Sequence, residues 1–181
     1  MNSESVIASG EGPRRRVRRR TDRDLDECVR MLAAVHERDG YPLNWPADPR
    51  DWLCRPSLLA AWVSELDGLV VGHIGLSRSE AGDVAPALWS TRQGVTGDAT
   101  AVVSRLFVAP GVRGHGIGAS LMAQAVQEAQ GRGLHPVLDV LASDTAAAAL
   151  YEWLGWELLA TVEQQWPPDR TVAVRCYAAA S

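Results

Sequence analysis

A glycine-rich run between a strand-like segment and a helix-like segment constrains this chain more than any other feature. The run Arg113-Gly114-His115-Gly116-Ile117-Gly118 follows the apolar stretch 102–108 and precedes a helical pattern that begins near Ala119. Glycines allow positive φ and a close approach of the backbone to a ligand. The start of a helix directs several backbone N–H groups, and the positive end of the helix dipole, toward one point. The sequence therefore predicts a phosphate-binding turn.

Two nucleotide-binding patterns compete for this turn. A nucleoside-triphosphate loop requires a lysine after its glycines, and it is excluded because all 18 basic residues of the chain are arginines. A dinucleotide fingerprint fits Gly114, Gly116 and Ala119, and Asp139 stands about where the ribose-binding acid is expected. However, residues 110–113 intervene after the strand, and too few residues follow for a doubly wound sheet. The dinucleotide interpretation is the weaker one.

The whole stretch 106–118 resembles the acetyl-CoA signature of the GNAT family of N-acetyltransferases. The pattern of that family, Arg/Gln-x-x-Gly-x-Gly/Ala, is matched by Arg113, Gly116 and Gly118. Further along, Leu150-Tyr151-Glu152-Trp153-Leu154-Gly155-Trp156 resembles the second signature of the family, a helical tyrosine followed by a glycine and an aromatic residue. Both motifs occur in the expected order and at the expected separation.

The resemblance implies acetyl-CoA as cosubstrate and no metal. Amides of the turn, with the charge of Arg113, would bind the pyrophosphate, and the main chain of the preceding strand would pair with the pantetheine arm. The side chain of His115 is expected to face solvent and not to act as a base. The residues expected to contact the cofactor are Leu106, Phe107, Val108, Arg113, Gly114, His115, Gly116, Ile117 and Gly118.

Tyr151 is the expected catalytic residue. An amine that attacks the thioester releases a thiolate, and a buried phenol can protonate it. Asp144 stands where the family commonly has asparagine, and it is interpreted as a helix N-cap. The strand glutamate that serves as general base in many relatives is replaced here by Val102. We name no general base, although the chain offers the candidates Glu65, His73, Asp98 and Asp139.

The expected activity is transfer of an acetyl group from acetyl-CoA directly to a primary amine, with a small-molecule acceptor preferred. Direct transfer is favoured because no cysteine is placed as a nucleophile. Two alternatives remain open: an acetyltransferase of protein or peptide N-termini, and a non-catalytic acyl-CoA-binding module. If Tyr41, Trp45, Trp52 and Trp166 line the acceptor pocket, a cationic amine with an apolar or aromatic body is expected.

Composition limits the remaining classes of function. The net charge of −4 argues against a nucleic-acid partner. Three widely spaced cysteines provide neither a disulfide framework nor zinc-ligand spacing. No apolar run is long enough to cross a membrane, and no apolar segment follows the N-terminal arginines as in a signal peptide. We therefore expect a cytoplasmic protein without membrane contact, and the resemblance allows a homodimer.

The order of elements favours a single α/β (α+β) domain with a mixed, partly antiparallel central sheet flanked by helices, as in the GNAT family. Residues 1–13 are expected to be a flexible tail and residues 14–181 the acetyltransferase domain. The six arginines of residues 14–20 are interpreted as part of an exposed first strand. The stretch 78–98 is expected to be a polar loop with a loose turn at 88–90. Helices are expected at 22–38, 50–54, 119–130 and 144–154, and strands at 16–21, 58–66, 69–76, 102–108, 136–141, 156–164 and 171–178.

Overall fold

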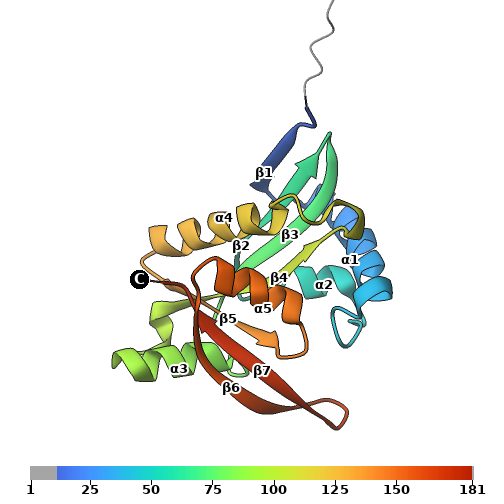
Figure 1. The fold of residues 1–181 in the computed structure, drawn as a ribbon. Coiled ribbons are helices and arrows are strands. Elements are labelled where there is room, and N and C mark those ends of the chain that lie inside the picture. Colours follow the sequence, from blue (N-terminus) through green and yellow to red (C-terminus); the bar gives the residue numbers. More distant parts are fainter. Residues whose placement is uncertain (1–11, 181) are drawn as a thin grey trace, which may run out of the picture.

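A seven-stranded sheet runs through the computed structural model, which describes residues 12–180 (Figure 1). The strand order is β1-β2-β3-β4-β5-β7-β6, and only β4 and β5 pair in parallel. This arrangement confirms the predicted mixed, partly antiparallel sheet. The strands are β1 (Arg15–Arg19), β2 (Leu58–Leu66), β3 (Leu69–Arg78), β4 (Thr100–Val108), β5 (His135–Leu141), β6 (Glu157–Trp166) and β7 (Arg170–Ala178).

Helices cover both faces of the sheet. On one face, α4 crosses the central strands and packs beside α5; on the other, α1 and α2 cover the β2–β4 region and α3 covers β5 and β7 (Figure 1). The helices are α1 (Leu25–Asp39), α2 (Pro49–Leu53), α3 (Val84–Gln93), α4 (Ile117–Gly131) and α5 (Thr145–Trp153), with short 3₁₀ turns at η1 (Asp22–Asp24), η2 (Gly97–Ala99) and η3 (Pro110–Val112). No helix within residues 12–180 is both long and apolar enough to cross a bilayer.

Alternating side chains of each strand divide the core between the two faces. In β4, Ala101 and Val103 pack in the cluster beneath α4, whereas Val102 between them packs beneath α3. In β2, Trp62 faces α4 and its neighbour Val63 faces α1. This period of two is that of a strand buried on both faces, and it explains why the predicted strands read as nearly continuous apolar runs.

The prediction of a polar loop over residues 78–98 is wrong, because this stretch contains helix α3. The first amides of the helix, those of Val84 and Ala85, donate to the Asp139 carboxylate at 2.9 and 3.0 Å. That carboxylate belongs to β5, so the N-cap is supplied from a distant part of the sequence. Ala85 is fully buried in the cluster between α3 and the sheet. Tertiary contacts therefore form a helix that local sequence only weakly favours.

The arginine-rich segment forms the edge strand β1, as predicted. Arg18 bridges the carboxylates of Asp24 and Glu65 at 2.8 and 2.6 Å, and Arg19 pairs with Glu128 of α4 at 2.6 Å. Arg18 and Arg19 therefore form ion pairs with carboxylates of the same chain. Most of the predicted flexible tail, residues 1–11, lies outside the described residues.

Candidate functional site

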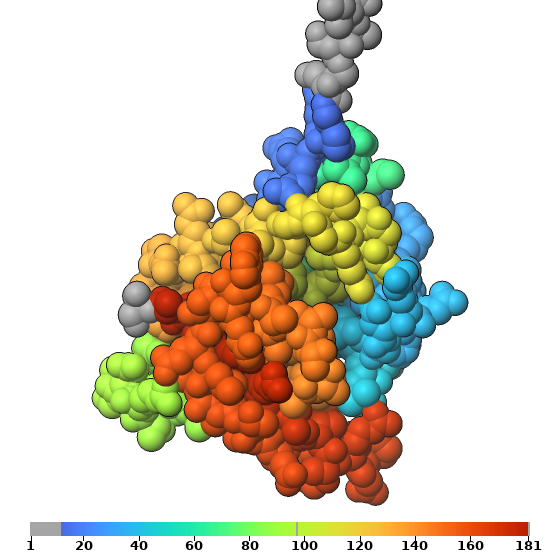
Figure 2. Space-filling view, viewed as in Figure 1, coloured from blue at the N-terminus to red at the C-terminus, as the bar shows by residue number. Residues whose placement is uncertain are grey.

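A cavity of about 630 Å³ opens where β4 and β5 separate. The two strands pair only from Thr100–His135 to Val102–Val137, so beyond Val102 the edge of β4 that faces β5 no longer meets a strand. The end of α1, the β4–α4 turn and α5 surround the resulting hollow (Figure 2). Three segments that are distant in sequence therefore meet at one site.

The glycine-rich turn forms one end of this cavity. Gly114 and Gly116 adopt left-handed φ angles of 81° and 73°, which strain any residue with a Cβ atom. Gly116 is the N-cap of α4, so the first amides of that helix have no partner within the helix. Gly118 serves packing instead, because a Cβ atom there would lie 3.2 Å from Leu150 of α5. The turn thus presents unpaired helical amides, as a phosphate site requires.

The structure brings all but one of the predicted cofactor-contacting residues to the cavity wall. The lining includes Leu106, Phe107, Val108, Arg113, Gly114, Gly116, Ile117 and Gly118. The exception is His115, which lies outside the lining. Its Nδ1 lies 3.1 and 3.0 Å from the carbonyl oxygens of Val112 and Arg113, and its own carbonyl accepts from Arg15 of β1. The His115 side chain is exposed and holds the shape of the turn.

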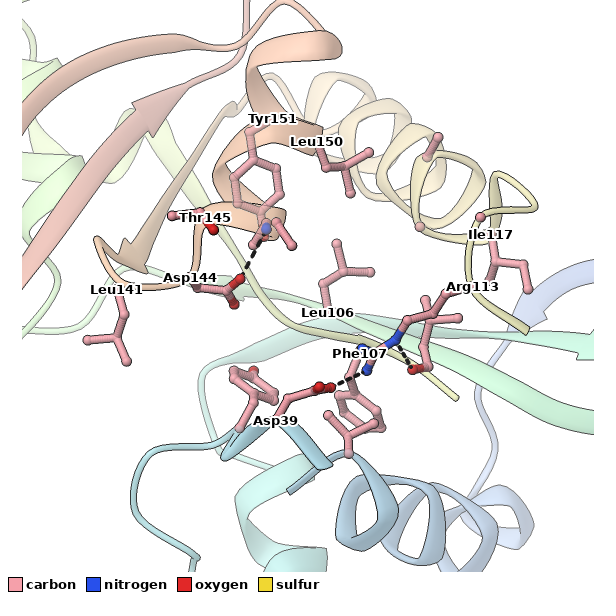
Figure 3. Close-up of a pocket in the computed structure, with 18 of the residues that line it drawn as sticks. Asp39, Leu106, Phe107, Arg113, Ile117, Leu141, Asp144, Thr145, Leu150 and Tyr151 are labelled. Atoms are coloured by element: carbon pink, nitrogen blue, oxygen red, sulfur yellow. Dashed lines mark hydrogen bonds and ion pairs between the residues drawn. The ribbon is translucent and has the colours of Figure 1, made fainter. Parts of the chain in front are cut away.

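Arg113 has a partner that the sequence did not reveal. Its guanidinium pairs with the Asp39 carboxylate at the end of α1, with an Nη2–Oδ2 distance of 2.6 Å. The Nε atom also donates to the Val108 carbonyl at 3.2 Å (Figure 3). Both charged residues line the cavity. The pair therefore links α1 to the phosphate-binding turn across the mouth of the site.

Tyr151 points from α5 into the cavity (Figure 3). The residue is only 7% exposed, and burial raises the pKa of its phenol well above the ordinary value. Its ring packs against the rings of Tyr177 and Trp156, with centroid distances of 5.9 and 6.1 Å. The phenol is therefore fixed in place and protonated over the whole physiological range.

Other residues of the β5–α5 connection also line the cavity, and the sequence motifs had not marked them as a set. Asp144 caps α5 by accepting from the Ala147 amide at 3.0 Å, which confirms its interpretation as an N-cap. Asp144 also lines the cavity. The whole lining group from this side consists of Leu141, Ser143, Asp144, Thr145, Ala146, Ala147, Leu150, Tyr151 and Trp153.

None of the four candidate bases reaches the cavity. Glu65 is paired with Arg18, Asp139 caps α3, and Asp98 is exposed on η2 outside the lining. His73 is fully buried, and burial lowers its pKa to about 3. Both of its ring nitrogens are engaged, by the Arg105 carbonyl and by the Arg20 guanidinium, each at 2.9 Å.

The structure places only one of the four aromatic residues considered for the acceptor pocket in the wall of this cavity. Tyr41 lines the cavity, but Trp45, Trp52 and Trp166 do not. Trp45 packs on His36 at a centroid distance of 5.1 Å, and the Trp166 indole donates to Gln164. In this cavity, the condition set for these four aromatic residues is therefore met by Tyr41 but not by the tryptophans. Within residues 12–180, no group of three or more His, Cys, Asp or Glu side chains is placed to hold a metal ion.

Comparisons with known proteins agree with this geometry. Residues 25–156 match the profile of the acetyltransferase (GNAT) family. The chain belongs to the GNAT acetyltransferase family. This membership covers the cavity, the glycine-rich turn and Tyr151, and it makes the protein an acetyl-CoA-dependent N-acetyltransferase. No curated protein matches the sequence.

Solved structures share the GNAT fold with this chain at low sequence identity. One is yncA of Salmonella typhimurium, solved with its cofactor acetyl-CoA, at 20% identity and a TM-score of 0.70, covering 91% of this chain and 92% of the other. A second is the ribosomal-protein-alanine N-acetyltransferase of Brucella melitensis, at 23% identity and a TM-score of 0.69, covering 92% of this chain and 99% of the other. A third is a GNAT family acetyltransferase of Brucella melitensis in complex with acetyl-CoA. It has 18% identity and a TM-score of 0.59, and the match covers 93% of this chain and 90% of the other.

Proposed function

We propose that this acetyltransferase moves the acetyl group of acetyl-CoA directly to the primary amine of a small molecule, with Tyr151 as the acid. The observation that carries the proposal is one continuous cavity with a phosphate-binding turn at one end and a buried phenol in its wall. The structures of yncA and of the Brucella melitensis GNAT acetyltransferase contain acetyl-CoA, and this chain shares their fold.

The β4–α4 turn suits the pyrophosphate of coenzyme A. The free amides at the start of α4 donate to it, and the helix dipole adds positive potential. Arg113 contributes a fixed charge after exchanging part of its contact with Asp39. The free edge of β4 at Leu106–Val108 then offers backbone groups to the amides of the pantetheine arm, because β5 has already diverged.

Tyr151 supplies the proton that the leaving sulfur needs. When the amine nitrogen forms its bond to the acetyl carbon, the carbon–sulfur bond breaks. The nitrogen releases one proton to solvent, and the sulfur takes up a proton from the Tyr151 phenol. A phenol with a raised pKa holds its proton until the thiolate develops, and a thiolate is basic enough to accept a hydrogen bond from it. The proton returns to the phenol through solvent after the products leave.

Direct transfer is supported by the positions of the cysteines. Cys28 and Cys176 are buried in the core and Cys54 is exposed on α2's C-terminal side, and none of the three lines the cavity. Burial also raises the pKa of the Cys28 thiol to about 12, which keeps it un-ionised and unreactive. A covalent acetyl-cysteine intermediate therefore has no suitable residue in the cavity.

A small acceptor is supported by the closure of the site on the side of the α1–α2 loop. The Asn44 side-chain amide donates to the Pro167 carbonyl at 3.2 Å, so this loop touches the turn between β6 and β7. Such a contact narrows the path along which an extended peptide would have to lie. The alternative acceptor is a protein N-terminus, and a protein acceptor is named for the ribosomal-protein-alanine N-acetyltransferase of Brucella melitensis, which shares this fold.

The test is acetyl transfer to matched acceptors, followed as release of free coenzyme A thiol and as product mass. Small primary amines and short peptides with free N-termini are compared at equal concentration. The proposal predicts turnover of small amines with kcat/KM at least about tenfold above that of the peptides, a modest difference in transition-state energy. Preferred turnover of peptides contradicts the small-molecule acceptor. Tight binding of acetyl-CoA without turnover of any amine supports the non-catalytic alternative.

A further inference from the structure

Arg105, in β4, carries a buried guanidinium that forms no salt bridge with any residue of the described range 12–180. The residue is 6% exposed, and its Nε and Nη2 atoms have no hydrogen-bond partner among residues 12–180. The third nitrogen, Nη1, donates only to the neighbouring Ser104 hydroxyl, at 3.2 Å. Buried charges in proteins are nearly always paired, because an unpaired one loses its hydration without compensation. This side chain therefore calls for an explanation beyond packing.

The surroundings keep the group charged but do not neutralise it. Its Cζ atom lies 4.3 Å from the centre of the Trp52 ring, a cation–π contact that stabilises the cation without using its N–H groups. Burial lowers its pKa to about 10, which leaves it charged at neutral pH. The two carboxylates that act on it electrostatically are engaged elsewhere: Glu80 pairs with Arg55, and Asp83 accepts from the Glu80 amide.

The backbone at this point is strained and held in place from outside the strand. Arg105 has a φ of 53°, in the left-handed region that favours glycine. The pairing of β3 with β4 shifts between His73 and Gly75, so β4 bulges here. The Arg105 carbonyl accepts from the buried His73 ring, which is itself fixed by Arg20. Strain that persists because surrounding contacts fix it is typical of functional sites.

Arg105 does not itself line the cavity, but it contacts Trp52 of α2 and is next to residues that do. The next residue, Leu106, lines the cavity, and so does Tyr41, whose phenol interacts electrostatically with Arg105. The Tyr41 and Trp52 rings lie 6.3 Å apart, so Tyr41, Trp52 and Arg105 form one cluster. Val108, at the end of β4, is three positions further along the strand than Arg105, a distance of about 10 Å. The cluster therefore lies on the strand well before the phosphate-binding turn, away from the pyrophosphate.

We propose that Arg105 binds a carboxylate of the acceptor, so that the substrate class is a small amine that also carries an acidic group, such as an amino acid. This inference rests on the proposed function. The Nε and Nη2 hydrogens lie along one edge of a guanidinium, and that edge binds both oxygens of a carboxylate in parallel hydrogen bonds. The two unpartnered nitrogens of Arg105 are the two that this geometry uses.

The experiment compares each acid with its own carboxamide. The α-amino acids, β-alanine and 4-aminobutyrate vary the distance between amine and carboxylate, and the carboxamides remove the charge. A site built around a polar group of the substrate discriminates strongly against analogues that lack it. For the best acceptor we expect kcat/KM of the acid to exceed that of the amide by about 100-fold, chiefly through KM.

Three variants assign that preference to the guanidinium. In Arg105→Gln the ratio of kcat/KM for the acid to kcat/KM for its carboxamide should fall to near one, with the KM for acetyl-CoA unchanged. In Arg105→Lys this ratio should stay between one and the wild-type value. Arg78→Gln makes the same change on an exposed arginine at the end of β3, and it should keep the wild-type ratio. The acid and its carboxamide differ in the pKa of the amine and therefore in the fraction of free amine. This difference is the same for every variant, so it cancels when the ratios of two proteins are compared.

Two results overturn the inference, and each is separable from failure of the proposed function. Equal use of acids and amides by the wild-type protein shows that no carboxylate is recognised, whether or not the variants fold. An acid preference that survives in Arg105→Gln assigns recognition to other residues. In both cases acetyl transfer itself stands. If the protein binds acetyl-CoA but acetylates neither acids nor amides, the proposed function fails and this inference fails with it.

Discussion

Tyr151 holds its proton because the α5 helix and the β7 strand bury it, and this gives the first prediction. Tyr151→Phe removes one oxygen and leaves the ring packing against Tyr177 and Trp156 intact. We expect kcat to fall by about 100-fold or more, the usual contribution of a general acid, with little change in the KM for acetyl-CoA. Steady-state assays of coenzyme A release measure both.

A matched control is available in the same core. Tyr177→Phe removes another buried phenol, whose hydroxyl donates to Glu152 at 2.8 Å outside the cavity lining. This variant should lose about 1 kcal/mol of stability and keep its kcat. A normal kcat in Tyr151→Phe, or an equal loss in both variants, would remove Tyr151 from the mechanism.

The pH dependence follows from the same group. An acid must be protonated to act, and burial raises the pKa of Tyr151 above its ordinary value of about 10. The Tyr151 phenol therefore loses its proton, and with it the ability to act as an acid, only at pH values above about 10. Because no candidate base reaches the cavity, kcat/KM should rise with pH as the free acceptor amine loses its proton, and then level off. A decline beginning below pH 9 in a pH–rate profile would contradict this assignment.

At the scale of the elements, α3 depends on a carboxylate from β5. Asp139→Ala removes the two hydrogen bonds to the Val84 and Ala85 amides. The expected loss is about 1–2 kcal/mol in the free energy of unfolding, as for other helix N-caps. Urea unfolding followed by circular dichroism measures it, and kcat/KM should be unchanged. A stable variant with impaired turnover would instead give Asp139 a role in the chemistry.

The sequence predicted elements wherever the signal was local, and failed where a partner came from far along the chain. The β2–β3 hairpin was predictable because Asp67-Gly68 alone suits a turn with positive φ at both positions, observed at 50° and 81°. The glycine-rich turn was predictable for the same reason. Helix α3 was not, since its cap lies on another strand. The Asp39–Arg113 pair joins segments brought together only by folding.

For the whole molecule, ion pairs of Arg18 with Asp24 and Glu65 hold the edge strand β1 in place. Arg18 holds the pKa of the Asp24 carboxyl well below its usual range by donating to it. A depressed pKa means that the stabilisation is fully present above the unfolded value of about 3.9 and is lost progressively as the pH falls from there through the lower folded value. Asp24→Asn should therefore cost about 2 kcal/mol at pH 7. In urea unfolding the difference between wild type and variant should shrink progressively as the pH is lowered below 4, and a constant difference would contradict this role of Asp24.

For the whole molecule, the proposed function puts acetyl-CoA in the cavity between α4, α5 and the end of α1. Calorimetric titration with acetyl-CoA tests it most directly, using the wild-type protein, Gly116→Trp and Gly133→Trp. Gly133 has a φ of 69°, close to the 73° of Gly116, but it lies outside the cavity lining. We expect micromolar or tighter binding of acetyl-CoA to the wild type and to Gly133→Trp, and no binding to Gly116→Trp. Absence of binding to the wild-type protein, or equal binding by all three, would contradict this placement of acetyl-CoA.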